Sequence, residues 1–150
     1  MTNEYKFFSG SSHPSLSKGI SDYLGVELGD ISLSKFSSNE LYALINETIR
    51  GVDVFVLQTC TEAVNDDLME LFVIMDTLKR CSAASGNVIM PYFGYSRQDK
   101  KSLPREPISA RLLADLLQSV GIDRLVTVDL HSDQIQGFFD KPVDHLTAMP

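Results

Sequence analysis

Cysteine is scarce and tryptophan is absent: the chain has two cysteines and no tryptophan in 150 residues. Cys60 and Cys81 lie far apart and form no Cys-x-x-Cys pair, which argues against a disulfide scaffold and a zinc site. We expect both to be reduced, partly buried thiols. Long hydrophobic runs are also missing, since no stretch of about 18 apolar residues occurs, and no signal-peptide pattern is present. These absences predict a soluble, cytoplasmic protein that does not engage a membrane.

Positive charge is in deficit as well. The sequence has 13 Lys and Arg residues against 20 Asp and Glu, and a formal net charge of -7. Nucleic acids and anionic membranes need a positive surface, so the overall charge argues against both as partners. The chain has no Walker A pattern and no G-x-S-x-G motif, which argues against a P-loop nucleotide binder and a serine-hydrolase elbow. Any anion site must therefore be local.

What the sequence does contain is an alternation of short β-rich runs and helical periodicity. Its length and its 43% apolar composition predict one domain with a sizeable core. The patterns predict a hairpin over 31–45, helices at 14–25, 66–82 and 107–121, and strands at 5–10, 51–59, 87–93 and 123–131. Strands that alternate with helices form βαβ units. The predicted fold class is therefore α/β with three layers, in which a mainly parallel sheet has helices on both faces.

The segment DLHSDQIQGFFDKPVDH, residues 129–145, concentrates titratable side chains directly after a predicted strand. Ligands of open α/β sheets bind outside the carboxyl ends of the strands, where Asp129 and His131 fall. Two residues apart on a strand, their side chains should project to one face and share a ligand. Carboxylates suit Mg²⁺, whereas the histidine could instead hydrogen-bond a phosphate. A solvated acidic loop with one strand-capping carboxylate remains the alternative.

Two more carboxylates close this segment. Asp140 and Asp144 follow the amphipathic stretch IQGFF. Because Pro142 lies between them, we expect a shaped loop here and not a regular element.

A basic loop, residues 95–106 (YSRQDKKSLPRE), follows the predicted strand 87–93. It holds four of the 13 basic residues of this acidic protein, namely Arg97, Lys100, Lys101 and Arg105. Arginine offers a planar fork of donors to a phosphate or a purine edge, and lysine offers a point charge. The pattern predicts an anion-binding loop on the same edge as His131. An exposed loop that serves only solubility is the alternative.

Six stretches of the sequence together resemble the N-terminal domain of ribose-phosphate diphosphokinase, also called phosphoribosyl pyrophosphate synthetase. They run in the family's order over nearly the whole chain. The stretches are FSSNE at 36–40, ETIRGVDVFVLQ at 47–58, NDDLMELFVIMDTLKR at 65–80, PYFGYSRQDKK at 91–101, REPISARLLADLL at 105–117 and DLHSDQIQGFFDKPVDH at 129–145. The resemblance implies a phosphoribosyltransferase-like domain.

The resemblance also implies a reaction and its site. The family transfers the β,γ-diphosphoryl group of ATP to the 1-hydroxyl of ribose 5-phosphate with Mg²⁺, giving phosphoribosyl pyrophosphate and AMP. Arg97 and Gln98 match the family's ATP-contacting pair, and His131 matches a catalytic position. The positions associated with metal and metal-nucleotide binding correspond to Asp129, His131, Asp140 and Asp144.

A further family feature is a loop that reaches the ATP site of a neighbouring subunit, which implies a homo-oligomer. It matches Phe36, Ser38, Asn39 and Glu40, with Phe36 available to stack on adenine. The family usually has Phe-Ser-Asp-Gly-Glu or Phe-Ser-Asn-Gly-Glu here, so Ser38 and Asn39 are departures. Arg50 resembles a residue of the family's regulatory phosphate site, although a solvated arginine at a strand end is the alternative.

The resemblance covers only the first part of the family's chain. Residues 1–150 are expected to form the single N-terminal domain, whereas the family's ribose-phosphate-binding domain has no counterpart in them. We therefore expect these residues alone to be inactive. One alternative is a catalytically silent, regulatory relative that binds nucleotide or synthetase subunits, and another is a nucleotide-binding α/β domain of unrelated chemistry.

Overall fold

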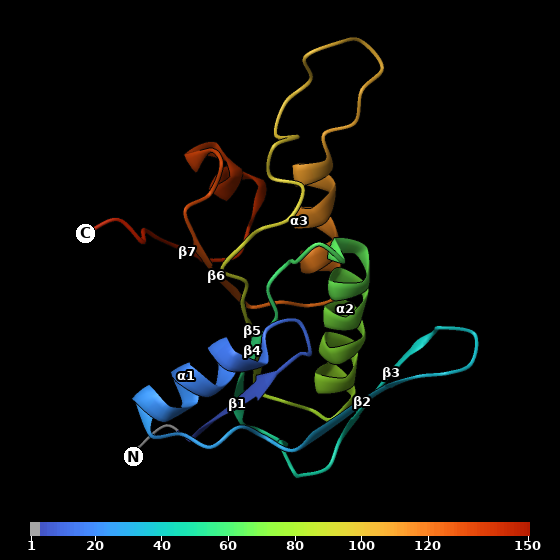
Figure 1. Ribbon diagram of the computed structural model, residues 1–150, viewed down its shortest axis with the longest axis vertical. Helices are drawn as coiled ribbons and strands as arrows, with labels where there is room; N and C mark the ends of the chain where they lie inside the picture. Colours follow the sequence, from blue (N-terminus) through green and yellow to red (C-terminus); the bar gives the residue numbers. More distant parts are fainter. Residues whose placement is uncertain (1–3) are drawn as a thin grey trace.

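The protein, described over residues 4–150 in a computed structural model, alternates strands and helices (Figure 1). In chain order the elements are β1 Tyr5–Ser9, α1 Pro14–Leu24, β2 Ile31–Lys35, β3 Leu41–Ile45, β4 Asp53–Leu57, α2 Val64–Arg80, β5 Ser85–Ile89, α3 Ser109–Ser119, β6 Arg124–Val128, the 3-10 helix η1 Asp133–Phe138 and β7 Val143–Leu146. Within the described residues no helix is both long and apolar enough to cross a membrane.

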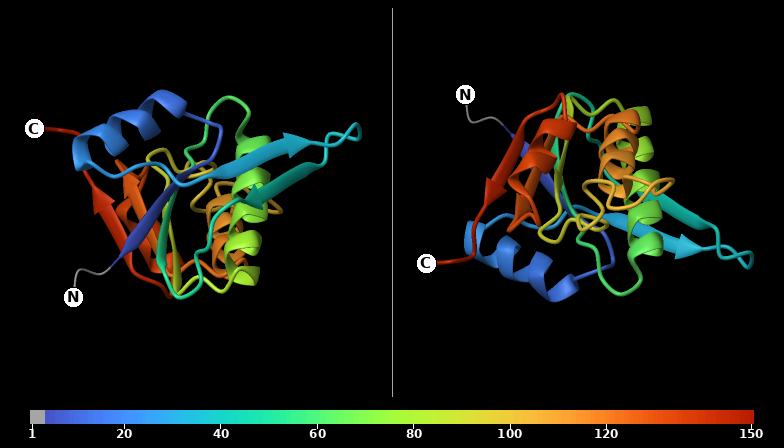
Figure 2. Two further views of the ribbon diagram at one scale, coloured as in Figure 1. Left: turned by 90° about the horizontal axis from the view of Figure 1, so that it is seen from below. Right: turned by 90° about the horizontal axis from the view of Figure 1, so that it is seen from above.

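Five strands form one parallel sheet in the order β1-β4-β5-β6-β7, and β2 pairs antiparallel with β3 in a separate hairpin. Helices α2 and α3 cover one face of the sheet, and α1 lies on the other side (Figure 2). Val56 of β4 belongs to the core under α2, whereas Ser9, which points the other way from β1, hydrogen-bonds Ser17 of α1. The predicted three-layer α/β class is confirmed.

Local signals explain the ends of α1. Pro14 begins the helix, and the ring Nδ1 of His13 accepts a hydrogen bond from the backbone N–H of Leu16 at 3.2 Å. At the other end Gly25 has φ 65°, a left-handed conformation that ends helices and that glycine adopts at little cost. The predicted helix 14–25 is therefore confirmed almost to the residue.

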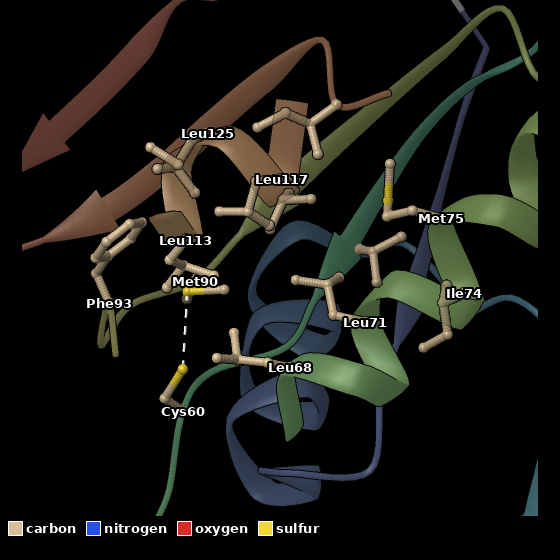
Figure 3. Packing of buried hydrophobic residues seen from close by; sticks show 14 of the residues in the cluster. Cys60, Leu68, Leu71, Ile74, Met75, Met90, Phe93, Leu113, Leu117 and Leu125 are labelled. Carbon is tan, nitrogen blue, oxygen red and sulfur yellow. Dashed lines mark hydrogen bonds between the residues drawn. The ribbon is translucent and has the colours of Figure 1, made fainter. Parts of the chain in front are cut away.

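The core lies between the sheet and the pair of helices α2 and α3 (Figure 3). Leu71 of α2 and Leu117 of α3 are both 0% exposed, and burial of one such side chain is worth about 1.5–3 kcal/mol. Leu113 is also buried, but Leu112 and Leu116 are 58% and 41% exposed. Neighbouring positions of a helix point about 100° apart, so Leu112 and Leu116 lie at the side of the buried face that Leu113 and Leu117 form.

The C-terminal part differs from the prediction in two ways. Strand β6 ends at Val128, so the predicted strand 123–131 is three residues too long at that end. The predicted loop around Pro142 is in part a strand, because β7 begins at Val143 and pairs in parallel with β6. Pro142 lies just before this edge strand, and its carbonyl accepts a hydrogen bond from the backbone N–H of Leu125. Proline is tolerated at the start of an edge strand, since no N–H is needed there.

Both cysteines are free, with Cys60 buried and Cys81 half-buried. The expectation of reduced, partly buried thiols is confirmed in this respect.

Candidate functional site

Two segments singled out by the sequence begin side by side at the carboxyl edge of the sheet. Strands β5 and β6 are adjacent and parallel, so both chains leave the sheet at the same edge. The backbone N–H of Met90 donates to Val126, and that of Val128 donates to Pro91, at 2.8 and 3.1 Å. The basic loop and the segment after β6, which begins at residue 129, therefore leave the sheet from neighbouring positions, 90–91 and 126–128. We call these positions their shared root, and they lie at the edge where ligands bind in open α/β sheets.

The root of the basic loop is tightly packed. A Cβ built on Gly94 would lie 2.8 Å from the Sγ of Cys60 and 2.8 Å from the Cγ2 of Val64, so any larger residue would force these side chains to shift. Phe93, one residue earlier, packs edge-on against Phe139 with 6.0 Å between ring centroids. The loop thus leaves the sheet from a rigid base.

Tyr95 then turns the chain. Its φ of 60° is rare for a bulky residue, and such a conformation costs about 1–3 kcal/mol. The Tyr95 hydroxyl hydrogen-bonds the side chain of Asn65 at the start of α2, and its carbonyl accepts from the N–H of Gln98 at 3.0 Å. The Gln98 carbonyl in turn accepts from Ala110 of α3. These bonds hold Arg97 and Gln98 in a fixed turn with both side chains exposed.

The remainder of the basic loop projects from the body of the domain (Figure 1). Lys100, Lys101 and Arg105 are exposed. The carboxylate of Glu106 accepts two hydrogen bonds from backbone N–H groups within the loop, both at 2.9 Å. The loop therefore presents its positive charges to solvent near the site.

The segment after β6 is braced by β7. Asp129 has φ 47°, and its backbone N–H donates to the carbonyl of Leu146 at 2.9 Å. Its carboxylate lies 3.3 Å from the N–H of Ala148 and is otherwise exposed. Because β6 has ended and Asp129 is left-handed, the strand alternation that was to align Asp129 with His131 does not apply. Both residues nevertheless lie exposed at the carboxyl edge.

The structure does not bring Asp140 and Asp144 together with Asp129. Helix η1 packs along α3, and the N–H of Asp140 donates to the side chain of Gln118 near the end of α3. The carboxylate of Asp144 accepts two hydrogen bonds from Arg124, at 2.8 and 3.0 Å, at the start of β6. Within residues 4–150 no group of three or more His, Cys, Asp or Glu side chains is arranged to hold a metal.

Comparison with known proteins identifies the family. A model of the N-terminal domain of ribose phosphate pyrophosphokinase matches residues 5–121. The chain belongs to the ribose-phosphate pyrophosphokinase family. The resemblance inferred from the sequence is thus confirmed.

Curated relatives in the family are named ribose-phosphate pyrophosphokinase. The protein of Fusobacterium nucleatum is 53% identical over 148 residues, which cover 99% of this chain and 47% of that protein. The Bacillus subtilis protein is 47% identical, over 100% of this chain and 49% of its own length. This chain therefore spans about half the length of the curated relatives it matches.

A solved structure shares the fold. The crystal structure of phosphoribosylpyrophosphate synthetase from Mycobacterium smegmatis superposes with a TM-score of 0.95 at 47% identity, covering 97% of this chain and 49% of that one. The phosphoribosyltransferase-like architecture expected from the resemblance is confirmed.

The β2–β3 hairpin, whose tip the resemblance assigns to an inter-subunit loop, projects away from β6 and β7 (Figure 2). All five residues of its tip, 36–40, are exposed. Phe36 is 54% exposed, and its ring packs edge-on against Tyr42. Asn39 has φ 69°, which explains why asparagine can stand where the family usually has glycine. The structure therefore does not place Phe36, Ser38 or Glu40 beside the basic loop of the same chain.

Arg50 lies elsewhere again. It is exposed just before β4, at the amino edge of the sheet, next to the turn in which the N–H of Gly51 donates to the carbonyl of Ser82 at 2.9 Å. It belongs to a different surface from the basic loop.

Sequence reasoning missed a buried polar network below the carboxyl edge of the sheet. Glu70 of α2, 7% exposed, accepts hydrogen bonds from the backbone N–H and the hydroxyl of Ser11 and from the Gln58 side chain, at 2.7 to 2.9 Å. Gln58 also accepts from the N–H of Ser12. The network fixes the connections after β1 and β4. Glu70 lies in a helical stretch, so only its burial distinguishes it from a solvated glutamate.

A cavity of about 270 Å³ lies between α2 and α3, and Tyr95 lines its rim. The other lining is mainly apolar, including Leu68, Phe72 and Leu113. It holds none of the predicted site residues, so it does not correspond to the charged site at the sheet edge.

Proposed function

We propose that this chain is the ATP-binding part of a ribose-phosphate diphosphokinase. The whole enzyme transfers the β,γ-diphosphoryl group of Mg-ATP to the 1-hydroxyl of ribose 5-phosphate. The observation that carries the proposal is the shared root of the basic loop and the segment after β6 at the carboxyl edge, in a chain of this family. A cationic loop beside an exposed carboxylate and imidazole suits a metal-nucleotide complex.

The basic loop binds the anionic part of the nucleotide. The guanidinium of Arg97 offers parallel donors to phosphate oxygens, and Lys100 and Lys101 add charge from the same loop. Gln98 supplies a neutral donor and acceptor beside Arg97. Phosphoryl transfer depends mainly on positioning and charge neutralisation, so this site needs no covalent nucleophile.

Asp129 and His131 fit a magnesium ion held mainly by phosphate. Within residues 4–150 the Asp129 carboxylate accepts a hydrogen bond only from the N–H of Ala148, at 3.3–3.4 Å, so its oxygens keep capacity for a hard cation. Mg²⁺ needs few protein ligands, because water and phosphate oxygens complete its shell. When bound, Mg²⁺ neutralises charge on the transferred group. His131, exposed at the same edge, hydrogen-bonds a phosphate oxygen in this proposal. The metal-binding roles of Asp140 and Asp144 stay predictions that rest on the resemblance alone.

The second substrate and the oligomer complete the proposal. Residues 1–150 contain no counterpart of the family's ribose 5-phosphate loop, and positioning of that substrate supplies about 7–11 kcal/mol of barrier lowering. We therefore propose that these residues alone bind Mg-ATP without turnover. The projecting hairpin with its exposed Phe36 suits insertion into the ATP site of a second subunit.

The experiment is a calorimetric titration of the protein with a non-hydrolysable ATP analogue in the presence of Mg²⁺. Arg97→Ala and Asp129→Asn should each weaken binding by about tenfold or more, as expected for a charged hydrogen bond worth about 1.5–3 kcal/mol. Arg80→Ala is the matched control, because Arg80 is exposed at the end of α2 and pairs with Asp76. Unchanged affinity in both site variants would contradict the proposal.

A full-length protein that binds the analogue normally but releases no AMP from Mg-ATP and ribose 5-phosphate would instead support the silent regulatory relative.

A further inference from the structure

His145 of β7 connects three parts of the molecule. Its Nε2 accepts a hydrogen bond from the backbone N–H of Leu130 at 2.9 Å. Its Nδ1 lies 3.3 Å from a carboxylate oxygen of Asp133 and 3.4 Å from the side-chain nitrogen of Gln136, both on η1. Only 19% of the His145 side chain is exposed. The imidazole therefore joins the edge strand, the segment after β6 and η1.

The hydrogen bond from Leu130 determines which nitrogen of the His145 ring is the acceptor. A backbone N–H can only donate, so Nε2 carries a lone pair and the ring proton is assigned to Nδ1, toward Asp133. A side chain at position 145 must therefore offer an acceptor at the distance of Nε2. Aliphatic side chains cannot do this, and shorter polar ones do not reach.

Leu130 lies between the two residues proposed to serve the nucleotide site. The N–H of Asp129 is held by the Leu146 carbonyl, and the next N–H, that of Leu130, is held by His145. Two consecutive backbone donors are thus tied to β7, which keeps the left-handed turn at Asp129 in place. Without the second tie the Leu130 N–H loses its acceptor, and the turn that spaces Asp129 and His131 can relax.

We propose that His145 is a positioning residue of the nucleotide site. It acts through the backbone of Leu130 to hold Asp129 and His131 in the arrangement that receives the metal-nucleotide, and it does not touch the ligand. This inference rests on the function proposed above and adds to it a residue that neither the sequence patterns nor the family match singled out.

The test separates the hydrogen-bond acceptor from the bulk of the side chain. His145→Leu keeps a comparable volume without an acceptor, His145→Asn is polar but too short, and His145→Gln returns an acceptor near the position of Nε2. Lys141→Met is the control, because Lys141 is exposed just before β7 and its nearest acid, Asp123, is 3.9 Å away. Circular dichroism melting establishes that each variant is folded.

The first readout is hydrogen exchange at the Leu130 amide, which needs no ligand. Leu130 should exchange about three- to tenfold faster in His145→Leu and His145→Asn, the factor expected for one neutral hydrogen bond. His145→Gln and the control should retain the slow exchange. Equal exchange in all variants would overturn the inference. If His145→Leu does not fold, His145→Asn against His145→Gln gives the same comparison.

The second readout is affinity for Mg²⁺ with the non-hydrolysable ATP analogue. We expect about three- to tenfold weaker binding in His145→Leu and His145→Asn, and recovery in His145→Gln. Normal affinity in the first two, while Arg97→Ala and Asp129→Asn weaken binding, would overturn the role of His145 alone. Normal affinity in Arg97→Ala and Asp129→Asn as well would overturn the proposed function, and the inference with it.

Discussion

Gly94 lies where the chain leaves the sheet for the basic loop, and Gly94→Ala tests whether that root is as rigid as its packing implies. The added methyl carbon would lie 2.8 Å from both the Sγ of Cys60 and the Cγ2 of Val64. Since non-bonded carbon contacts are comfortable at about 3.5–4.0 Å, each contact must open by about 0.7–1.2 Å. Cys60 cannot easily give way, because it is 6% exposed and its sulfur lies 3.9 Å from that of Met90 (Figure 3).

We expect Gly94→Ala to lower the free energy of unfolding by about 1–3 kcal/mol, the usual cost of overpacking. It should also weaken nucleotide binding, because Arg97 follows on the displaced chain. Urea unfolding and analogue titration measure the two effects. Gly19→Ala is the matched control: among the described residues, no atom outside its own stretch of helix backbone lies within 4 Å of its added carbon, and Gly19 lies inside α1. That substitution should stabilise the protein by about 0.5–1 kcal/mol.

A double-mutant cycle decides whether the cause is the clash. In a Cys60→Ala background the sulfur is gone, so Gly94→Ala should cost less by about 0.5 kcal/mol or more. Equal costs in the two backgrounds, or a Gly94→Ala protein as stable as the wild type, would refute the steric reasoning.

Three other predictions each concern one side chain. Burial raises the pKa of the Cys60 thiol from 9.0 to about 11. A thiol reagent should therefore modify Cys81 first, and Cys60 only on unfolding. Because the unfolded Cys60 thiol ionises at a lower pH than the folded one, the free energy of unfolding should fall as pH rises from 9.0 to about 11. Glu70→Gln should cost about 1–3 kcal/mol in urea unfolding, because the amide turns one of the two acceptor oxygens into a donor that faces the Ser11 hydroxyl and removes the charge that strengthens the other hydrogen bonds; a neutral effect would contradict the network. Asp144→Asn should cost about 0.2–1 kcal/mol through Arg124 and leave nucleotide affinity unchanged; tenfold weaker binding in calorimetry would instead support the metal role that the resemblance implies.

Features with local signals were predictable from the sequence. Pro14 marks the start of α1 and Gly25 its end. The apolar run of β4 predicts a buried strand, and its Val54 and Val56 are fully buried. The basic loop was placed correctly at the carboxyl edge, because the strand before it could be read and the edge follows from parallel pairing.

Features that depend on distant contacts were not predictable. β7 is a strand because it pairs with β6, and the sequence around Pro142 suggests only a loop. The strand β6 stops where Asp129 becomes left-handed, held by β7. Asp144 is near His131 in the sequence, but η1 and the start of β7 carry it to Arg124 instead.

The resemblance supplied residue roles that no spacing rule contains, and these roles stay predictions, although the structure shows which of the residues lie near one another. Arg97 and Asp129 lie on segments that leave the sheet at neighbouring points, whereas the hairpin that carries Phe36 projects away from them (Figure 2), so its ATP contact stays a prediction. His145 stood within the acidic segment, but nothing in the sequence links it to the backbone of Leu130.

The central claim is that nucleotide binds at the carboxyl edge of the sheet, between the basic loop and the segment after β6. Photo-crosslinking with an azido-adenine analogue of ATP in the presence of Mg²⁺, followed by peptide mapping, tests it most directly. We predict label on peptides from residues 95–106 or 129–136, or on the hairpin tip 36–40 if a second subunit contributes, and competition by unlabelled ATP. Competed label confined to the cavity between α2 and α3 or to the amino edge around Arg50 would contradict the account.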